Sequence, residues 1–218
     1  MPSAAYIAPR LVLTSAPAEE PVTLAELKAW LKLDDDAQDD LLTSLLATAR
    51  AVLEDITGRA CVASQWTAYY DAWPRAGTYV GACAAREIAL PKCPLLPGDE
   101  LGVESVTYLD EDGTEQTLDA ADYTVEAGVS PNRYGRLRLV AGAAIPSLGD
   151  FPGALRVTFH AGYGAAADVP AEIKSAIKQL AGHFHTNPVP VNTGNIVTEV
   201  PYTLKFLIEH LTVAPLEA

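Results

Sequence analysis

The stretch that decides the fold is LKLDDDAQDDLLTSLLATARAVLEDITG, residues 31–58, in which an acidic cluster leads directly into a leucine-rich segment. Five aspartates lie between Asp34 and Asp40. After them, apolar residues recur at the 3.6-residue spacing of a helix with one buried face: Leu41, Leu42, Leu45, Leu46, Ala49, Val52, Leu53 and Ile56. Gly58 follows at a position where helices commonly end in the left-handed conformation. The stretch therefore predicts one long amphipathic helix.

The aspartates are best explained by the start of that helix. Carboxylates in a first turn accept from N–H groups that lack a helical partner, and they oppose the positive end of the helix dipole. We expect Asp35 or Asp36 to cap the helix, with the last two aspartates in its first turn. A calcium loop would need a glycine sixth and a glutamate twelfth. Counted from the first aspartate these positions hold Asp39 and Leu45, so the calcium pattern fails.

Helices are also predicted at both ends of the chain. In EPVTLAEL, residues 20–27, Thr23 and Glu26 have the spacing of a capping box, and that helix should end near Leu33. A later helix has Pro170 in its first turn, and its buried face should hold Ile173, Ile177, Leu180, Ala181 and Phe184. A final helix from about Tyr202 should bury Leu204, Leu207, Ile208 and Leu211.

The middle of the chain reads as β-structure. Alternating or short apolar segments predict strands in SQWTAYYDAW, REIALPKCPL, YGRLRLV and GALRVTFHAGYG. The segment 103–128 predicts two strands around a turn at Asp110–Gly113, followed by a third strand. The Asp-x-Asp-Gly of that turn has its glycine at the fourth position, where a calcium loop does not have one. It therefore indicates a hairpin.

These segments predict an α+β fold: a small all-helical bundle formed by both termini, with an inserted antiparallel β-rich subdomain. The expected division of the chain has five parts. They are an N-terminal arm (1–21), a first helical part (22–60), the β-rich insertion (61–164), a second helical part (165–187), and a linker with the C-terminal helix (188–218).

Composition limits the kinds of partner. Hydrophobic residues make up 49% of the chain and the formal net charge is -13, with no basic zone along the sequence. A surface that grips phosphates needs clustered Lys and Arg, whereas an acidic chain is compatible with DNA that passes without being bound. The odd number of cysteines (Cys61, Cys83 and Cys93) argues against a closed disulfide framework. Neither a signal peptide nor a bilayer-spanning run is expected, which favours a soluble cytoplasmic product.

The chain offers no pattern of reactive residues. No G-x-S-x-G elbow occurs, and the small-residue motif AGYGAAA lacks the third glycine and the lysine of a phosphate-binding loop. Cys83 and Cys93 are too far apart for a C-x-x-C knuckle, and His183 and His185 point to different faces of a helix. We expect no catalytic residue, no metal site and no cofactor, and hence no enzyme.

Several stretches together carry a resemblance to a known family. These are residues 20–59, IALPKCPL, SVTYLDEDGTEQTLDAADYTV, RVTFHAGYG, VPAEIKSAIKQLAGHFHTN and VPYTLKFLIEHL. In this order they resemble tailed-phage head–tail connector (adaptor) proteins of the HK97-type connector family and their gene transfer agent relatives. The resemblance extends over residues 20–211. The extended N-terminus and AWPRAGTYVGACAARE, residues 72–87, depart from it.

The resemblance implies a structural virion protein that forms a twelve-fold ring homo-oligomer in the neck of the particle. Its expected partners are other copies of itself, the portal protein, and a stopper or tail protein. DNA would pass through the lumen transiently and without sequence-specific binding. The protein would be made in the bacterial host cytoplasm and would have no membrane partner.

The interfaces of such a ring are expected in two places. Because a closed ring needs one contact patch on each side of the subunit, the aromatic residues of the β-region are candidates for contact between subunits: Trp66, Tyr69 and Trp73. The segment before and within the last helix is the candidate for contact with the portal: Ile196, Val197, Val200, Tyr202 and Phe206. An extended segment there suits addition of a strand to a partner sheet.

Two alternatives remain open at this point. The chain could be a stopper or tail-completion protein, which would be another virion part. It could also be a monomeric β-rich binding module that recognises a carbohydrate or a peptide. A virion part should form rings or bind portal, whereas a monomeric module should change its melting temperature with its ligand.

Overall fold

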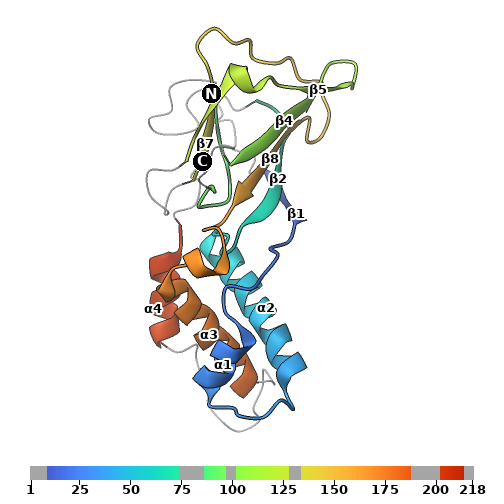
Figure 1. The fold of residues 1–218 in the computed structure, drawn as a ribbon. Helices are drawn as coiled ribbons and strands as arrows, with labels where there is room; N and C mark the ends of the chain where they lie inside the picture. Colours follow the sequence, from blue (N-terminus) through green and yellow to red (C-terminus); the bar gives the residue numbers. More distant parts are fainter. Residues whose placement is uncertain (1–8, 74–85, 97–101, 128–133, 188–201, 214–218) are drawn as a thin grey trace. The chain divides into compact units, whose positions relative to one another are not determined.

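The computed structural model describes residues 9–73, 86–96, 102–127, 134–187 and 202–213. The fold is α+β, with helices from both ends of the chain and antiparallel strands from its middle and from the N-terminal strand β1 (Arg10–Ser15) (Figure 1). The chain divides into two compact units: a helical unit, residues 18–62 and 163–213, and a β unit, residues 1–17, 63–162 and 214–218. The predicted fold class is confirmed.

The helical unit contains α1 (Leu24–Leu31), α2 (Asp39–Thr57), α3 (Ala171–Thr186) and α4 (Tyr202–Leu211), together with the short 3-10 helix η2 (Ala166–Asp168). Helix α2 packs against α3, and α4 packs on both of them. Segments from the two ends of the sequence share one apolar core, whose buried members are Val22, Leu27, Leu42, Leu46, Ala49, Leu53, Cys61, Val62, Val169, Ile173, Ala176, Ile177, Leu180, Ala181, Leu204 and Leu211. Burial of this shared face is the main force that holds the unit together.

Helix α1 begins and ends as its sequence predicts. The Glu26 backbone N–H donates to Thr23 Oγ1 at 3.2 Å, and the Thr23 backbone N–H donates to Glu26 Oε2 at 2.8 Å. These two bonds are the expected capping box. After α1, Lys32 takes the left-handed conformation with φ 59°. The expected Gly58 does the same after α2, with φ 73°.

The expected capping of α2 by Asp35 or Asp36 is wrong. The capping position is Gln38, whose side chain makes no capping bond. Asp35 instead accepts from the Ala37 backbone N–H at 3.1 Å, within the turn that precedes the helix. Asp36 forms an ion pair with Lys28 of α1, and the same ammonium bonds Asp39 at 2.8 Å. These carboxylates therefore join α2 to α1.

This lysine also changes the acidity of its partners. Its hydrogen bond to Asp36 lowers the pKa of that carboxyl, and the bonds that Lys28 donates to Asp36 and Asp39 raise the pKa of Lys28. Asp36 is exposed, and Lys28 and Asp39 are partly exposed, so these ion pairs contribute more to the geometry of the α1–α2 turn than to stability.

The buried stripe of α2 is narrower than predicted. Leu42, Leu46 and Leu53 are buried, but Leu41 and Ile56 are 50% and 49% exposed. Both exposed residues lie beside the stripe, at the two ends of the helix. Helix α2 packs against α1, α3 and α4, and the parts of its broad apolar face that lie outside these contacts stay exposed.

The β unit contains a five-stranded antiparallel sheet in the order β1-β2-β8-β4-β5 and a three-stranded sheet in the order β3-β7-β6. The strands of the first sheet are β1 (Arg10–Ser15), β2 (Ser64–Tyr70), β8 (Leu155–Ala161), β4 (Val103–Leu109) and β5 (Glu115–Thr117). Those of the second are β3 (Glu87–Ala89), β7 (Arg136–Leu139) and β6 (Tyr123–Glu126), the last preceded by the 3-10 helix η1 (Ala120–Asp122). Alternate residues of β8 are fully buried, as expected for a sheet with one face in a core.

Strand β1 was not predicted. It lies in the segment that the sequence analysis treated as an N-terminal arm, and it pairs with β2, with Arg10 opposite Tyr69 and Leu13 opposite Trp66. Thr14 and Thr67 share a hydrogen bond of 2.7 Å between their hydroxyl groups. The N-terminal segment therefore forms an edge of the larger sheet.

The turn between β4 and β5 is the predicted hairpin. The carboxylate of Asp110 accepts from Gln116 Nε2 at 3.0 Å and from the backbone N–H groups of Thr114 at 2.8 Å and Asp112 at 3.1 Å. These bonds, with the one from Gln116 the strongest, lower the pKa of Asp110. Gly113 has φ 78°, a conformation that favours glycine. The acidic residues here close a turn.

Candidate functional site: interface elements and a buried polar network

Of the residues expected to contact the portal, those with a described position lie on helix α4. Ile196, Val197 and Val200 lie outside the described residues, and Tyr202 begins α4 without a described side chain. Phe206 is 61% exposed, the most exposed large apolar side chain of the described residues. Its ring stacks on His210 one turn later, with centroids 6.4 Å apart. The outer face of α4 therefore presents an aromatic pair to solvent.

The opposite face of α4 is packed. Leu204 and Leu211 are buried, and Leu207 and Ile208 are half-buried against the same core. These four residues are the predicted buried face of the last helix. Near the start of the helix, Thr203 Oγ1 donates to Gln179 Oε1 of α3 at 3.3 Å. Because the inner face is used within the unit, the outer face is the part of α4 that can meet a partner.

Two of the three aromatic residues expected between subunits are half-buried under cationic side chains of the β unit. The ammonium of Lys92 lies 4.8 Å from the ring centre of Trp66, whose indole N–H donates to Ser64 Oγ at 2.9 Å. The guanidinium of Arg10 lies 4.4 Å from the ring centre of Tyr69, and that of Arg156 lies 5.9 Å away. Such contacts hold the rings in place. Trp66 and Tyr69 each keep some surface for a neighbour.

The expected exposure of Trp73 is wrong. Its side chain is only 9% exposed, at the end of the segment that follows β2. A large aromatic side chain gains stability when its apolar surface is buried. Trp73 buries this surface within its own subunit. It therefore offers little contact area to another subunit.

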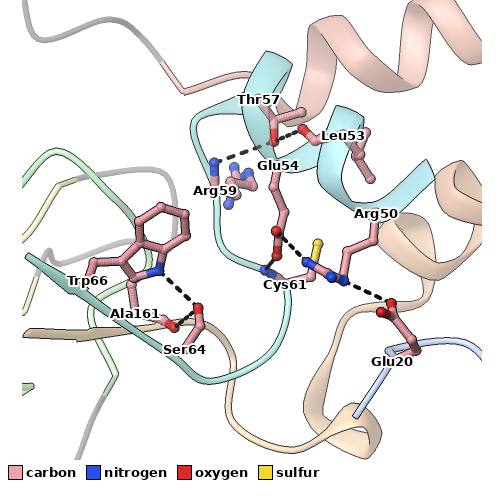
Figure 2. A network of polar contacts seen from close by, with 10 residues as sticks. All are labelled: Glu20, Arg50, Leu53, Glu54, Thr57, Arg59, Cys61, Ser64, Trp66 and Ala161. Atoms are coloured by element: carbon pink, nitrogen blue, oxygen red, sulfur yellow. Dashed lines mark hydrogen bonds and ion pairs between the residues drawn. The ribbon is translucent and has the colours of Figure 1, made fainter. Parts of the chain in front are cut away.

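A chain of fully or partly buried charges lies along the second half of α2. Arg50 donates from Nε to Glu20 Oε2 and from Nη1 to Glu54 Oε2, both at 2.8 Å. The other oxygen of Glu54 accepts from the Cys61 backbone N–H at 2.7 Å (Figure 2). Glu54 is buried. The network fixes the loop after α2 and the segment before α1 onto one helix, and buried charges of this kind are tolerated because each has a partner.

Arg59 is a second buried cation, directly after the glycine that ends α2. It is 3% exposed. Its Nε donates to the backbone oxygen of Leu211 at 2.6 Å, and its Nη1 donates to the Tyr163 hydroxyl at 2.7 Å. Next to it, the Thr57 hydroxyl donates to the Leu53 backbone oxygen at 2.6 Å (Figure 2). Arg59 therefore connects the end of α2, the end of α4 and the return of the chain into the helical unit.

The roles of the buried Arg59 and the partly buried Arg50 were not expected from the sequence. Charged residues within and just after an amphipathic helix are usually solvated, and nothing in the local pattern distinguishes Arg50 or Arg59 from such residues. The one available signal is the position of Arg59 after a helix-ending glycine, where a cation can reach the carbonyl groups of a neighbouring helix end.

The histidines make ordinary polar contacts. His185 Nε2 lies 2.8 Å from Gln38 Oε1, and His160 Nε2 lies 3.3 Å from Glu104 Oε2 at the surface. Within the described ranges, no three His, Cys, Asp or Glu side chains come together in an arrangement that could hold a metal ion. In the same ranges, no helix has the length and apolar character needed to cross a bilayer.

Comparison with known proteins agrees with this fold. Over 94% of its length, the chain superposes with a TM-score of 0.71 on 96% of a chain in the structure described as "Neck of empty GTA particle computed with C6 symmetry", at 22% sequence identity. It matches 95% of a chain in "Virion of native gene transfer agent (GTA) particle" equally well, at 22% identity. For a chain in "Neck of native GTA particle computed with C12 symmetry" the TM-score is 0.67 over 94% and 96% of the two chains, at 20% identity. The fold is that of proteins in the neck of gene transfer agent particles.

A family match places the resemblance on particular residues. Residues 21–74 match the family model of Phage gp6-like head-tail connector protein. This segment contains α1, α2 and β2 with the loops between them. No curated protein matches the chain. The predicted resemblance to head–tail connectors is therefore confirmed.

Proposed function

We propose that this protein is a head–tail connector: a structural protein of the virion neck that assembles as a ring under the portal and links the capsid to a stopper or tail protein. The observation that carries the proposal is the coincidence of two matches. The connector family model covers α1, α2 and β2, and the whole fold, with its shared helical core, superposes on chains of gene transfer agent necks. The proposal assigns no catalytic role.

The proposed ring is built from heterologous contacts, in which one patch of a subunit meets a different patch of its neighbour. Trp66 and Tyr69 are candidate contacts because each ring is held by cations yet remains partly accessible. The necks that this fold resembles were determined with C6 and C12 symmetry, and we propose a twelve-fold ring here.

DNA is proposed to pass through the lumen without being held. A net charge of -13 repels phosphates over distances of about 10 Å at ordinary salt. A lumen with few cations lets the duplex move, because tight neutralisation of phosphates would slow it. This property suits a passage and does not suit a nucleic-acid-binding site.

The contact with the portal is proposed to involve α4 and the segment before it, from Ile196 to Phe206. The support is the exposed face of α4, where the stacked pair of Phe206 and His210 lies opposite the buried Leu204 and Leu211. Aromatic residues in such positions commonly carry much of the binding energy of an interface.

A pull-down with the portal protein tests the proposal. The full chain should retain the portal, and a chain truncated after Asn187 should not, because it lacks α4. The truncation also removes Leu204 from the helical core and so exposes the core residues that it covers. The matched variant is therefore Phe206→Ser in the full chain, which leaves the core intact. Normal portal retention by both variants would refute the proposed contact. Retention of a tail protein in place of the portal would indicate a stopper or tail-completion protein.

A further inference from the structure

We infer that Arg59 is the residue that positions helix α4, and therefore the face that α4 presents to a partner. The inference rests on the proposed function, in which α4 contacts the portal. Helix α4 has 10 residues, and a helix of that length is marginal in water without tertiary contacts. The contacts that hold α4 to α2 and α3 must therefore determine whether and where it forms.

The start of α4 is held weakly. Leu204 provides a buried apolar contact there. The polar contact from Thr203 Oγ1 to Gln179 Oε1 is at the surface and 3.3 Å long. An exposed neutral hydrogen bond of this kind contributes little, because water competes for both groups. Among the described residues at the start of α4, Leu204 is the one buried anchor, and an apolar contact has no directional component.

The end of α4 is held by directional bonds in a buried place. The last carbonyl groups of a helix have no partner within the helix, and Arg59 Nε supplies one to Leu211 at 2.6 Å. Beside it, the Val213 backbone N–H donates to the backbone oxygen of Thr57 at 3.0 Å. The guanidinium charge also opposes the negative end of the α4 dipole. A buried, charge-assisted bond is about twice as strong as a neutral one.

Arg59 can act as a fixed point because its own position is set from two other sides. Its backbone N–H lies 3.4 Å from Thr57 Oγ1, directly after the end of α2. Its Nη1 donates to Tyr163 Oη at 2.7 Å. One planar group thus holds Leu211 in a fixed direction relative to the end of α2. Two directional bonds on a planar guanidinium specify an orientation, which an apolar contact cannot do.

The position of Phe206 follows from this arrangement. Phe206 lies on the same short helix as Leu211, about 7.5 Å along its axis at 1.5 Å per residue. A rotation or displacement of the end of α4 would therefore move the stacked ring of Phe206 as well. Arg59, which is buried within the helical unit, becomes a positioning residue for the outer face of α4.

Hydrogen exchange of the full chain tests the inference with matched variants. Arg59→Met removes the donors Nε and Nη1 and keeps an unbranched side chain, whereas Arg59→Lys keeps a cation that can still reach Leu211 but cannot also reproduce the planar contact with Tyr163. The control is Arg50→Met, which removes the part-buried bonds to Glu20 and Glu54 without touching α4. Exchange is followed separately in α2, α3 and α4.

In Arg59→Met, the amides of α4 should exchange at least about tenfold faster relative to those of α3, since a buried charged bond is lost. Arg59→Lys should restore part of the protection. Arg50→Met should change the exchange rates of the α4 and α3 amides by the same factor. The inference is overturned if Arg59→Met leaves α4 protection unchanged, or if it speeds exchange equally in all three helices. Should Arg59→Met fail to fold, Arg59→Lys and Tyr163→Phe test the inference by the same measure, the exchange rate of the α4 amides relative to that of the α3 amides. Faster relative exchange in α4 is expected in both variants.

A portal-binding arm separates this inference from the proposed function. Portal retention should fall at least about tenfold in Arg59→Met and stay within about twofold in Arg50→Met. If the wild-type chain retains no portal while α4 responds to Arg59 as expected, the proposed contact fails and the positioning of α4 by Arg59 stands. If α4 exchanges faster in Arg59→Met while portal retention is unchanged, Arg59 does not control the partner-binding face.

Discussion

The carboxylate of Glu54 accepts the backbone N–H of Cys61 across 2.7 Å, so a side chain in the last turns of α2 holds the loop that leaves that helix. The same carboxylate accepts from Arg50 at 2.8 Å. Glu54 is thus shared between a backbone donor and a cation, in a place from which water is largely excluded. This arrangement fixes the exit of the chain from the helical unit.

Glu54→Ala should destabilise the protein by about 3 kcal/mol, because it removes this carboxylate from the partly buried Arg50 guanidinium and from the buried Cys61 N–H. Urea unfolding followed by circular dichroism measures the change. Glu209→Ala, an exposed substitution on the outer face of α4, provides the control and should change stability by less than about 0.5 kcal/mol. Equal stability of the Glu54 and Glu209 variants would contradict the role given to Glu54.

The capping box of α1 gives a second test. Thr23→Ala removes the oxygen that accepts from the Glu26 N–H, and a lost cap of this kind costs about 1 kcal/mol. Thr23→Ser keeps the oxygen and should cost only a small part of that. A Thr23→Ala variant as stable as the wild type in urea would show that the bond contributes nothing in solution.

The pH dependence of the same cap has a defined sign. The bond from the Thr23 backbone N–H, partly opposed by burial, lowers the pKa of Glu26 below its ordinary value of 4.5. A carboxyl with a lowered folded-state pKa adds stability above its unfolded pKa, and this stability is lost as the pH falls through the folded value. We expect the stability difference between wild type and Glu26→Gln to shrink as the pH is lowered from 6 toward about 3. A constant difference across this range would contradict the assignment.

Much of this fold could be predicted from local patterns. The capping box, Gly58 and the 3.6-residue spacing locate α1 and α2 to within a few residues, and the Asp110–Gly113 turn locates a hairpin. These features depend on neighbours in the sequence. Strand β1 depends on pairing Arg10 with Tyr69, which the periodicity of a short N-terminal segment does not indicate.

The errors have the same origin. Whether Asp36 caps a helix or binds Lys28 depends on how α1 and α2 meet, and whether Trp73 is exposed depends on what the β unit packs around it. The buried roles of Glu54 and Arg59 also arise from tertiary contacts. Tertiary contacts determine the roles of these residues, and the local sequence does not show which distant residues will contact them.

The exposed ring of Phe206 makes a prediction about binding without a change in stability. Phe206→Ser removes apolar surface that is 61% exposed, so the free energy of unfolding should change by less than about 0.5 kcal/mol. Portal affinity should fall at least about tenfold if this ring is an anchor of the interface. Isothermal calorimetry with purified portal measures the affinity, and Lys205→Ala on the neighbouring outer position is the control. Unchanged affinity in Phe206→Ser would remove Phe206 from the interface.

Electron microscopy of the full-length chain mixed with its purified portal is the most direct test of the connector assignment. We expect a ring of this protein stacked coaxially on the portal ring, with an open central channel. A portal ring without added density, when the protein is present in excess and correctly folded, would contradict the assignment.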